Sequence, residues 1–149
     1  MKLGRTILIG AIAGLGMGLA LFIAGAVASR LVYGPQMAPA GKFKPEQINA
    51  LYFIWTKLLI GGFFGVLLSV LYERLPLSRR IGGAAEGLRY AFLLWLVVYL
   101  WGLSHPFVYD GYASLDRNQL FWMVYSLGGF LGLGIAFGWL RRRWSGSAA

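Results

Sequence analysis

A single charged side chain, Lys57, lies inside one of the long apolar runs of this sequence. Placing a lysine at the centre of a membrane costs ~2.5–3.5 kcal/mol, and less toward an edge. One interpretation is a site for an anion or a carboxylate, with Asp110, Asp116 and Glu46 as candidates on the same side. The alternative is a lysine whose stem carries its ammonium up to the outer headgroups. Lys57 precedes Gly61 by four positions, so a helix would turn it toward protein more than toward lipid.

His105 is the only histidine, and it precedes Pro106 in a region that also holds Asp110 and Asp116. A lone histidine cannot supply two axial haem ligands, and the two aspartates stand at no recognised metal spacing. A structural role for His105 is therefore favoured. The absence of cysteine excludes disulfides, thiolate metal sites and iron–sulfur clusters. We expect no cofactor and no metal.

The usual catalytic patterns are missing from the sequence. No glycine-rich phosphate loop follows a strand, no histidine–glutamate metalloprotease helix occurs, and no serine nucleophile has a histidine and a carboxylate to accompany it. Buried ionisable pairs also look scarce, which argues against proton-coupled transport. Enzymatic activity is thus unsupported, and a non-enzymatic role is favoured.

The composition is that of a membrane protein. Hydrophobic residues make up 58% of the 149 residues and charged residues only 13%, against about half and about a quarter in soluble domains. The net charge of +9 does not indicate nucleic acid, because the Lys and Arg residues stand at the edges of apolar blocks. We expect one all-α domain over residues 1–149, an integral membrane four-helix bundle.

Four segments are long and apolar enough to cross a bilayer, which needs roughly 20 helical residues. The third is expected to end at Ser104, because Pro106 disfavours helix in the residue before it. The predicted spans cover residues 6–29, 50–72, 88–104 and 118–140.

The distribution of Lys and Arg predicts the orientation of the spans, since cytoplasmic connections carry the excess. Nine of these residues flank one side and four the other, so both termini are expected in the cytoplasm. The nine are Lys2, Arg5, Arg74, Arg79, Arg80, Arg89, Arg141, Arg142 and Arg143, and the four are Arg30, Lys42, Lys44 and Arg117. The alternative is a cleaved secretory signal ending at Ala26-Val27-Ala28, which would leave three spans.

The four predicted spans form two helical hairpins, and short segments of the first hairpin are similar in sequence to segments of the second. Gly61-Gly62-Phe63-Phe64-Gly65 is matched by Gly128-Gly129-Phe130-Leu131-Gly132, and Val32-Tyr33-Gly34 by Val108-Tyr109-Asp110-Gly111. A weak parallel duplication would explain the match. The alternative is chance, because glycine–phenylalanine strings are common in membrane helices.

Small residues recur every four positions in three spans, as in GxxxG helix-packing motifs. One interpretation is that a single bundle uses all of these stripes internally, with the third span peripheral. The other is that one stripe faces another subunit, the Gly134 and Gly138 face being the leading candidate. The packing glycines are Gly10, Gly14, Gly18, Gly61, Gly65, Gly128, Gly132, Gly134 and Gly138.

The glycine-rich first span, Tyr33-Gly34-Pro35, the Gly-Gly-Phe-x-Gly strings and the basic connections resemble the small four-span bacterial inner-membrane proteins of unassigned function. The resemblance implies a location in a bacterial inner membrane, and it implies no functional residues for this chain. Three functions are compatible: an accessory or scaffold subunit of a membrane assembly, a small channel or carrier with an outward-facing cavity near Lys57, and a lipid- or quinone-binding protein. The expected partners are membrane lipids and other membrane subunits or further copies, with no nucleic acid.

Overall fold

The computed structural model describes residues 3–34, 50–75, 83–109 and 117–146. Within these ranges the chain is entirely helical, and no strand is present. The four helices pack together and confirm the expected all-α class. They are α1 (Leu3–Tyr33), α2 (Ala50–Arg74), α3 (Ala84–Tyr109) and α4 (Arg117–Gly146).

The helices extend beyond the predicted apolar spans at most of their ends. Their lengths are 31, 25, 26 and 30 residues, or ~37 Å for the shortest, against ~30 Å for a hydrocarbon core. The largest difference is in α3, which begins at Ala84 and continues through His105 and Pro106 to Tyr109. The expected end at Ser104 was wrong, because a proline removes one backbone donor without stopping a helix whose other bonds persist.

Glycines with positive φ lie at two helix boundaries. Gly34 (φ 83°) follows α1 and donates its N–H to the Arg30 carbonyl at 3.1 Å, as glycines past a helix end commonly do. Gly83 (φ 69°) precedes α3, and its carbonyl accepts from the Gly87 N–H at 3.3 Å. Glu86 in the first turn of α3 complements the positive end of that helix dipole.

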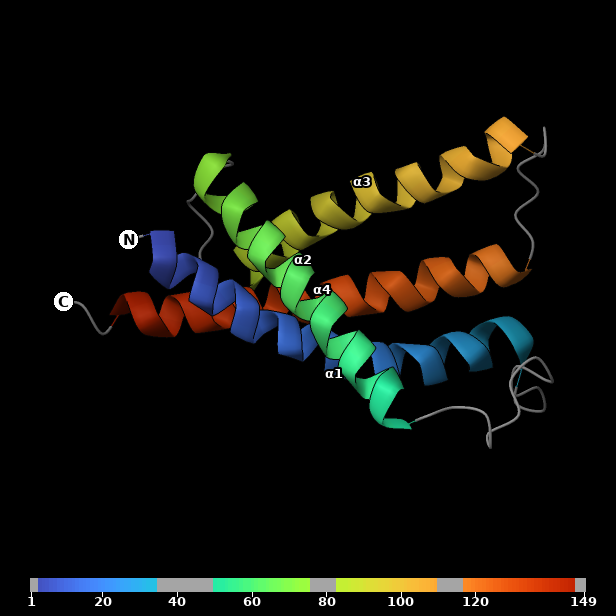
Figure 1. The fold of residues 1–149 in the computed structure, drawn as a ribbon, viewed down its shortest axis with the longest axis horizontal. Helices are drawn as coiled ribbons and strands as arrows, with labels where there is room; N and C mark the ends of the chain where they lie inside the picture. The colour runs from blue at the N-terminus through green and yellow to red at the C-terminus, as the bar shows by residue number, and fades with distance from the viewer. Residues whose placement is uncertain (1–2, 35–49, 76–82, 110–116, 147–149) are drawn as a thin grey trace.

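The helices are arranged in the order α2, α1, α4, α3, so that α1 and α4 form the centre of the bundle. Helix α2 packs mainly against α1 and crosses it at a large angle, whereas α3 packs mainly against α4 (Figure 1). The start of α1, the end of α2, the start of α3 and the end of α4 lie at one end of the molecule. Helix α3 is peripheral, as the sequence predicted, but α2 is equally so.

Helices α1 and α2 meet through glycine backbones. A Cβ built at Gly14 would overlap the Gly61 carbonyl oxygen, and one at Gly10 would overlap the Gly65 carbonyl oxygen. Farther along, a Cβ at Gly18 would lie 3.5 Å from the Lys57 carbonyl oxygen. The two backbones therefore touch over two turns, an approach that only glycine permits.

The opposite side of α1 packs against α4. A Cβ at Gly128 would lie 2.5 Å from the Ala24 Cβ, and one at Gly132 would overlap the Ala20 Cβ. Leu21 fills the space beside Gly129. Helix α1 thus has two small-residue faces, one for each neighbour, which explains its place at the centre.

Helices α4 and α3 are also joined by glycines. A Cβ at Gly134 would lie 2.8 Å from the Gly87 carbonyl oxygen, and one at Gly138 would lie 2.8 Å from the Gly83 carbonyl carbon. The Gly134 and Gly138 face is therefore covered by α3 of the same chain, as the interpretation of a single bundle expects, and the alternative that this face meets another subunit is wrong. A stripe of small residues therefore begins at Gly83, just before α3, and continues with Gly87 and Ala91 on the helix; the predicted start at residue 88 excludes its first two members.

The matching glycine strings are not used equivalently. Gly61 and Gly65 of α2 pack against α1, and Gly128 and Gly132 of α4 also pack against α1, whereas a hairpin repeat would turn them toward α3. The stripes that bind α3 lie further along α4, at Gly134 and Gly138. The packing of these helices therefore gives the proposed duplication no support.

The outer surface of the bundle is apolar. Large hydrophobic side chains such as Leu19 and Ile23 on α1 are 66% and 70% exposed. Among the described residues, three helical segments are long and apolar enough to cross a membrane: Leu3–Tyr33, Ile54–Arg74 and Gln119–Trp144. This surface and these lengths are compatible with a membrane protein.

Candidate functional site

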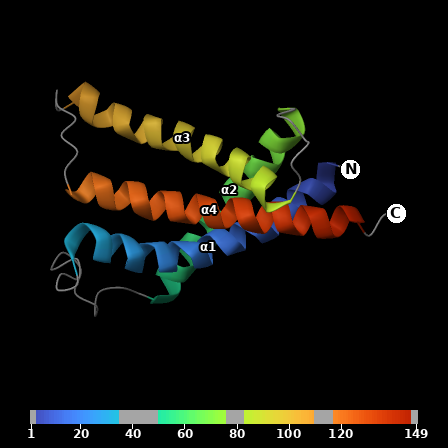
Figure 2. The same cartoon turned by 180° about the vertical axis from the view of Figure 1, so that it is seen from behind.

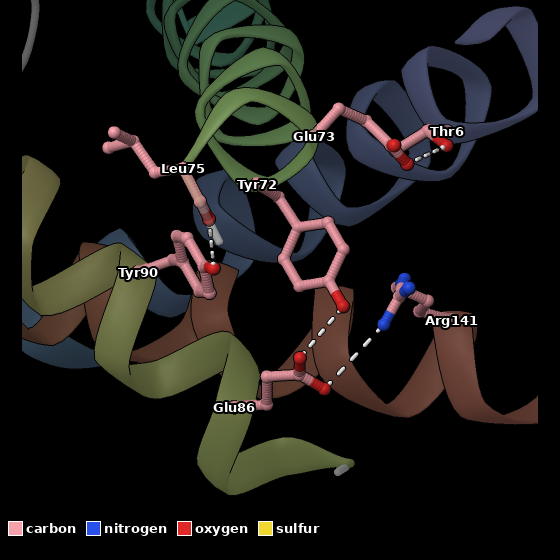
Figure 3. Close-up of polar contacts among 7 residues, drawn as sticks. All are labelled: Thr6, Tyr72, Glu73, Leu75, Glu86, Tyr90 and Arg141. Carbon is pink, nitrogen blue, oxygen red and sulfur yellow. Dashed lines mark hydrogen bonds and ion pairs between the residues drawn. The ribbon is translucent and has the colours of Figure 1, made fainter. Parts of the chain in front are cut away.

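The described part of the bundle has one buried carboxylate that forms an ion pair, Glu86 at the start of α3. Its side chain is 7% exposed. Tyr72 of α2 donates its hydroxyl proton to Glu86 Oε1 at 2.7 Å, and Arg141 Nη1 of α4 lies 3.5 Å from Glu86 Oε2 (Figure 3). Glu86 therefore joins three helices at one point. A buried carboxylate needs such partners, because an uncompensated charge in a low-dielectric interior is costly.

Arg141 is held by Tyr72 as well as by Glu86. Its guanidinium carbon lies 3.9 Å from the centroid of the Tyr72 ring, a favourable cation–π distance. The Tyr72 ring also contacts Tyr90 at 4.9 Å and Phe137 at 5.5 Å between centroids. Tyr72 is 1% exposed, so the hydroxyl–carboxylate bond is dry and contributes ~1.5–3 kcal/mol. The arginine is about one quarter exposed, and water screening reduces its pairing energy.

Two further contacts extend this group of polar residues across the same end of the bundle. Tyr90 donates its hydroxyl proton to the Leu75 carbonyl at 2.6 Å, which connects α3 to the end of α2. Thr6 of α1 donates to Glu73 Oε1 of α2 at 2.8 Å. We call the side chains that make these neighbouring contacts the Glu86 cluster; they are Thr6, Tyr72, Glu73, Glu86, Tyr90 and Arg141.

Ser69 supports the cluster from the α1–α2 interface. Its hydroxyl lies 2.9 Å from both the Thr6 and the Gly65 carbonyl oxygens, and the side chain is fully buried. At the other side of α1, Arg5 donates to the Trp144 carbonyl at the end of α4. All four helices are therefore tied together at the end where α1 begins.

The Glu86 cluster has the chemistry of a structural clamp. Glu73 and Glu86 both bind groups of neighbouring helices, and the described residues contain no group of three His, Cys, Asp or Glu side chains that could hold a metal ion. The tyrosine hydroxyl and the guanidinium both face the carboxylate and stabilise its charge. The arrangement can hold α2, α3 and α4 together at this end of the bundle.

Sequence reasoning missed this cluster. The expected scarcity of buried ionisable pairs is wrong for Glu86 and Arg141, which lie just outside the predicted spans 88–104 and 118–140. Tyr72 and Tyr90, which stand at or near the ends of the predicted spans, are both buried. A signal was available: Glu86 and Tyr90 are four residues apart, so a helix starting at residue 84 places them on one face with the glycine at 87.

Lys57 lies on α2 with its side chain half-buried. Its Nζ is 5.0 Å from the centroid of the Tyr125 ring on α4, within range of a cation–π contact. Tyr125 in turn stacks on Phe121 at 5.8 Å and meets Trp122 edge-on at 5.5 Å. The lysine therefore contacts protein, and its electron-rich neighbour is a tyrosine that sequence reasoning did not select.

The other predicted site residues fall where the structure gives no side-chain geometry. Asp110, Asp116 and Glu46 lie outside the described residues. His105 belongs to helix α3, but its side chain is also outside the described part. The proposed grouping of these residues with Lys57 therefore stays a prediction.

Comparison with known proteins adds no relationship. No protein-family model, no curated protein and no solved structure matches this chain.

Proposed function

We propose that the chain is a non-enzymatic accessory or scaffold subunit of a larger membrane assembly, with four spans in a bacterial inner membrane. In this proposal the spans form two hairpins, and both termini lie in the cytoplasm. The nine-to-four distribution of Lys and Arg supports this orientation. The presence of the start of α1 and the end of α4 at one end of the bundle agrees with it.

The outer face of α2 is the observation that carries the proposal. Trp55, Leu59 and Phe63 form one stripe at four-residue spacing and are 62%, 69% and 65% exposed. Gly61 and Gly65, which bind α1, lie on the other side of the helix. The exposure of these three side chains shows that the stripe faces away from α1, whereas α2 as a whole crosses α1 at a large angle (Figure 1).

Such a stripe fits another transmembrane helix. Bulky aromatic residues supply most of the contact energy at the centres of protein interfaces. A partner helix could pack along the full stripe without displacing α1. The two carboxylates of the Glu86 cluster are engaged within the chain, which also favours a role for the outer surface.

In-membrane photo-crosslinking tests this proposal. A photoreactive amino acid at Leu59 should form a crosslink to a second, larger polypeptide, whereas the same group at Leu19 of α1 should not. Leu19 is a matched control, because it is 66% exposed and also apolar. Gentle extraction, sizing and mass spectrometry should identify the same partner. A lone monomer or dimer, or equal crosslinking from both positions, would contradict the accessory role.

The half-buried charge of Lys57 within an apolar stretch of α2 supports a second candidate, a small channel or carrier in which Lys57 attracts an anion. The test is ion flux through liposomes containing the purified protein. Lys57→Leu should abolish anion selectivity, and Lys57→Arg, which keeps the charge and the ring contact, should preserve it. No flux from the wild type, or unchanged selectivity in Lys57→Leu, would rule out this candidate.

A further inference from the structure

The exposed face of α4 changes in chemical character along its length. Leu131, Ile135 and Trp139 follow one another at four-residue spacing and are 37%, 50% and 53% exposed. Arg142 and Arg143 come next, and both are exposed. One continuous stripe therefore runs from aliphatic to aromatic to cationic.

The side of α4 that meets α2 carries Phe130 and Phe137, whose rings lie 4.9 Å from Phe64 and 5.5 Å from Tyr72 between centroids, and the stripe lies on a different side. Figure 2 shows α4 in front, with α2 behind it and α1 and α3 at its flanks. The other faces of α4 are occupied, since Gly132 meets α1 and Gly134 meets α3. The stripe is thus a shallow lateral surface and not an interface between helices of this chain.

The cationic end of the stripe is partly ordered by its neighbours. The guanidinium carbon of Arg143 lies 5.3 Å from the Trp139 ring centroid. The Arg142 side chain passes beside Gly83, where a Cβ would lie 3.6 Å from Arg142 Cδ. An arginine restrained in this way loses less conformational freedom when it binds an anion.

We propose that this stripe binds one anionic phospholipid. Leu131 and Arg143 are ~18 Å apart along the helix axis, close to the ~15 Å of hydrocarbon in half a bilayer. An acyl chain would lie along Leu131 and Ile135, the glycerol region beside Trp139, and the phosphate near Arg142 and Arg143. Tryptophan favours this interfacial depth, and guanidinium groups bind phosphate in a bidentate manner.

The charge around the stripe supports an anionic headgroup over a zwitterionic one. Arg5 and Arg141 lie at the same end of the bundle. The acidic residues described at this end are Glu73 and Glu86, and both already bind Thr6 or Tyr72. The exposed arginines therefore face the headgroup layer as a net positive surface. This inference concerns α4 and does not depend on the role proposed for α2.

Native mass spectrometry of the purified full-length chain tests the inference. The probes are phosphatidylglycerol and phosphatidylcholine, added in equal amounts in detergent. The wild type should retain phosphatidylglycerol preferentially. Each arginine near a lipid surface contributes ~1 kcal/mol, so Arg143→Gln should lower this preference about fivefold. Trp139→Leu keeps the charge, and its lost ring contact should lower the preference about two- to fivefold.

Arg74→Gln is the matched control, since it removes one exposed positive charge at the end of α2. Its preference for phosphatidylglycerol should stay near that of the wild type. Arg143→Lys keeps the charge and replaces Arg143→Gln in the test if that variant does not fold. Its preference for phosphatidylglycerol should lie between those of the wild type and Trp139→Leu. Inorganic phosphate should not displace the lipid, because it cannot use Leu131 and Ile135.

Several results would overturn the inference. Equal losses in Arg74→Gln and Arg143→Gln would indicate diffuse charge attraction, and an unchanged preference in Trp139→Leu would remove the stripe from the site. Displacement by inorganic phosphate would indicate a free-anion site. Absence of any lipid preference in the wild type, or a protein or second copy crosslinked at Ile135, would also refute it.

Discussion

Two adjacent glycines of α2 provide a direct test of how the helices are held together. Gly61 faces α1, and a Cβ added there would overlap the Gly14 carbonyl oxygen and lie 3.1 Å from the Gly14 carbonyl carbon and 3.3 Å from the Gly18 nitrogen. Gly62, the next residue, has nothing within 4 Å of the same position. Gly61→Ala and Gly62→Ala therefore make the same chemical change in the same helix and differ only in the neighbour.

The expected effect of Gly61→Ala follows from the atoms that the methyl group meets. They belong to the backbone of α1 and cannot rotate away, so the two helices must separate by ~1 Å to restore ordinary contact. A gap of that size loses about a quarter to a half of the dispersion energy at neighbouring contacts. Overpacking of this kind costs ~1–3 kcal/mol. The Gly62→Ala protein should instead gain ~0.5–1 kcal/mol, because alanine restricts the unfolded chain.

Reversible unfolding in mixed detergent micelles measures the difference. We expect the free energy of unfolding of Gly61→Ala to lie ~1.5–4 kcal/mol below that of Gly62→Ala. Helical content by circular dichroism should be the same in both folded proteins, so that only the packing differs. Equal stability of the two variants, or a larger loss in Gly62→Ala, would refute the close backbone contact between α1 and α2.

Three further predictions concern the Glu86 cluster, the glycine interface between α3 and α4, and the orientation of the C-terminus. Tyr72→Phe keeps the ring but removes the hydroxyl bound to Glu86, and should lower the free energy of unfolding by ~1–3 kcal/mol in the same assay; an unchanged value would contradict a dry hydrogen bond. Gly138→Ala should loosen α3 and speed amide hydrogen exchange in its first turns, because the added Cβ would lie 2.8 Å from the Gly83 carbonyl carbon; unchanged exchange would argue against the contact. Alkaline phosphatase fused after Ala149 should be inactive in bacteria, whereas an active fusion would place the C-terminus outside.

The helices themselves were largely predictable, but their exact ends were not. Hydropathy identifies the part of a helix that crosses the apolar layer, and the helices continue past it into polar residues. Residues 84–87 show the consequence: they precede the predicted third span, so the apolar pattern does not reveal that Glu86 and Gly87 belong to the helix. Pro106 shows the converse, since a local preference at one residue did not outweigh the helix on either side.

The candidate site was less predictable than the fold. Lys57 was identified because a charge in an apolar run is costly wherever it points. The contact of Lys57 with Tyr125 could not be predicted in this way, because the contact depends on how α2 lies relative to α4. The Glu86 cluster was missed for the same reason: Tyr72, Glu86 and Arg141 come from three helices, and no spacing along the chain brings them together.

The sequence by itself determined the all-α class, the approximate positions of the helices and the small residues through which they pack. These properties are local, since they depend on runs of apolar residues and on four-residue periodicity. Only the tertiary structure decided which small-residue stripe packs against which neighbouring helix. Gly134 and Gly138 bind α3, and Gly128 and Gly132 bind α1. A glycine face permits close approach to any small-residue face, so the choice of partner is made by the packing of all four helices at once.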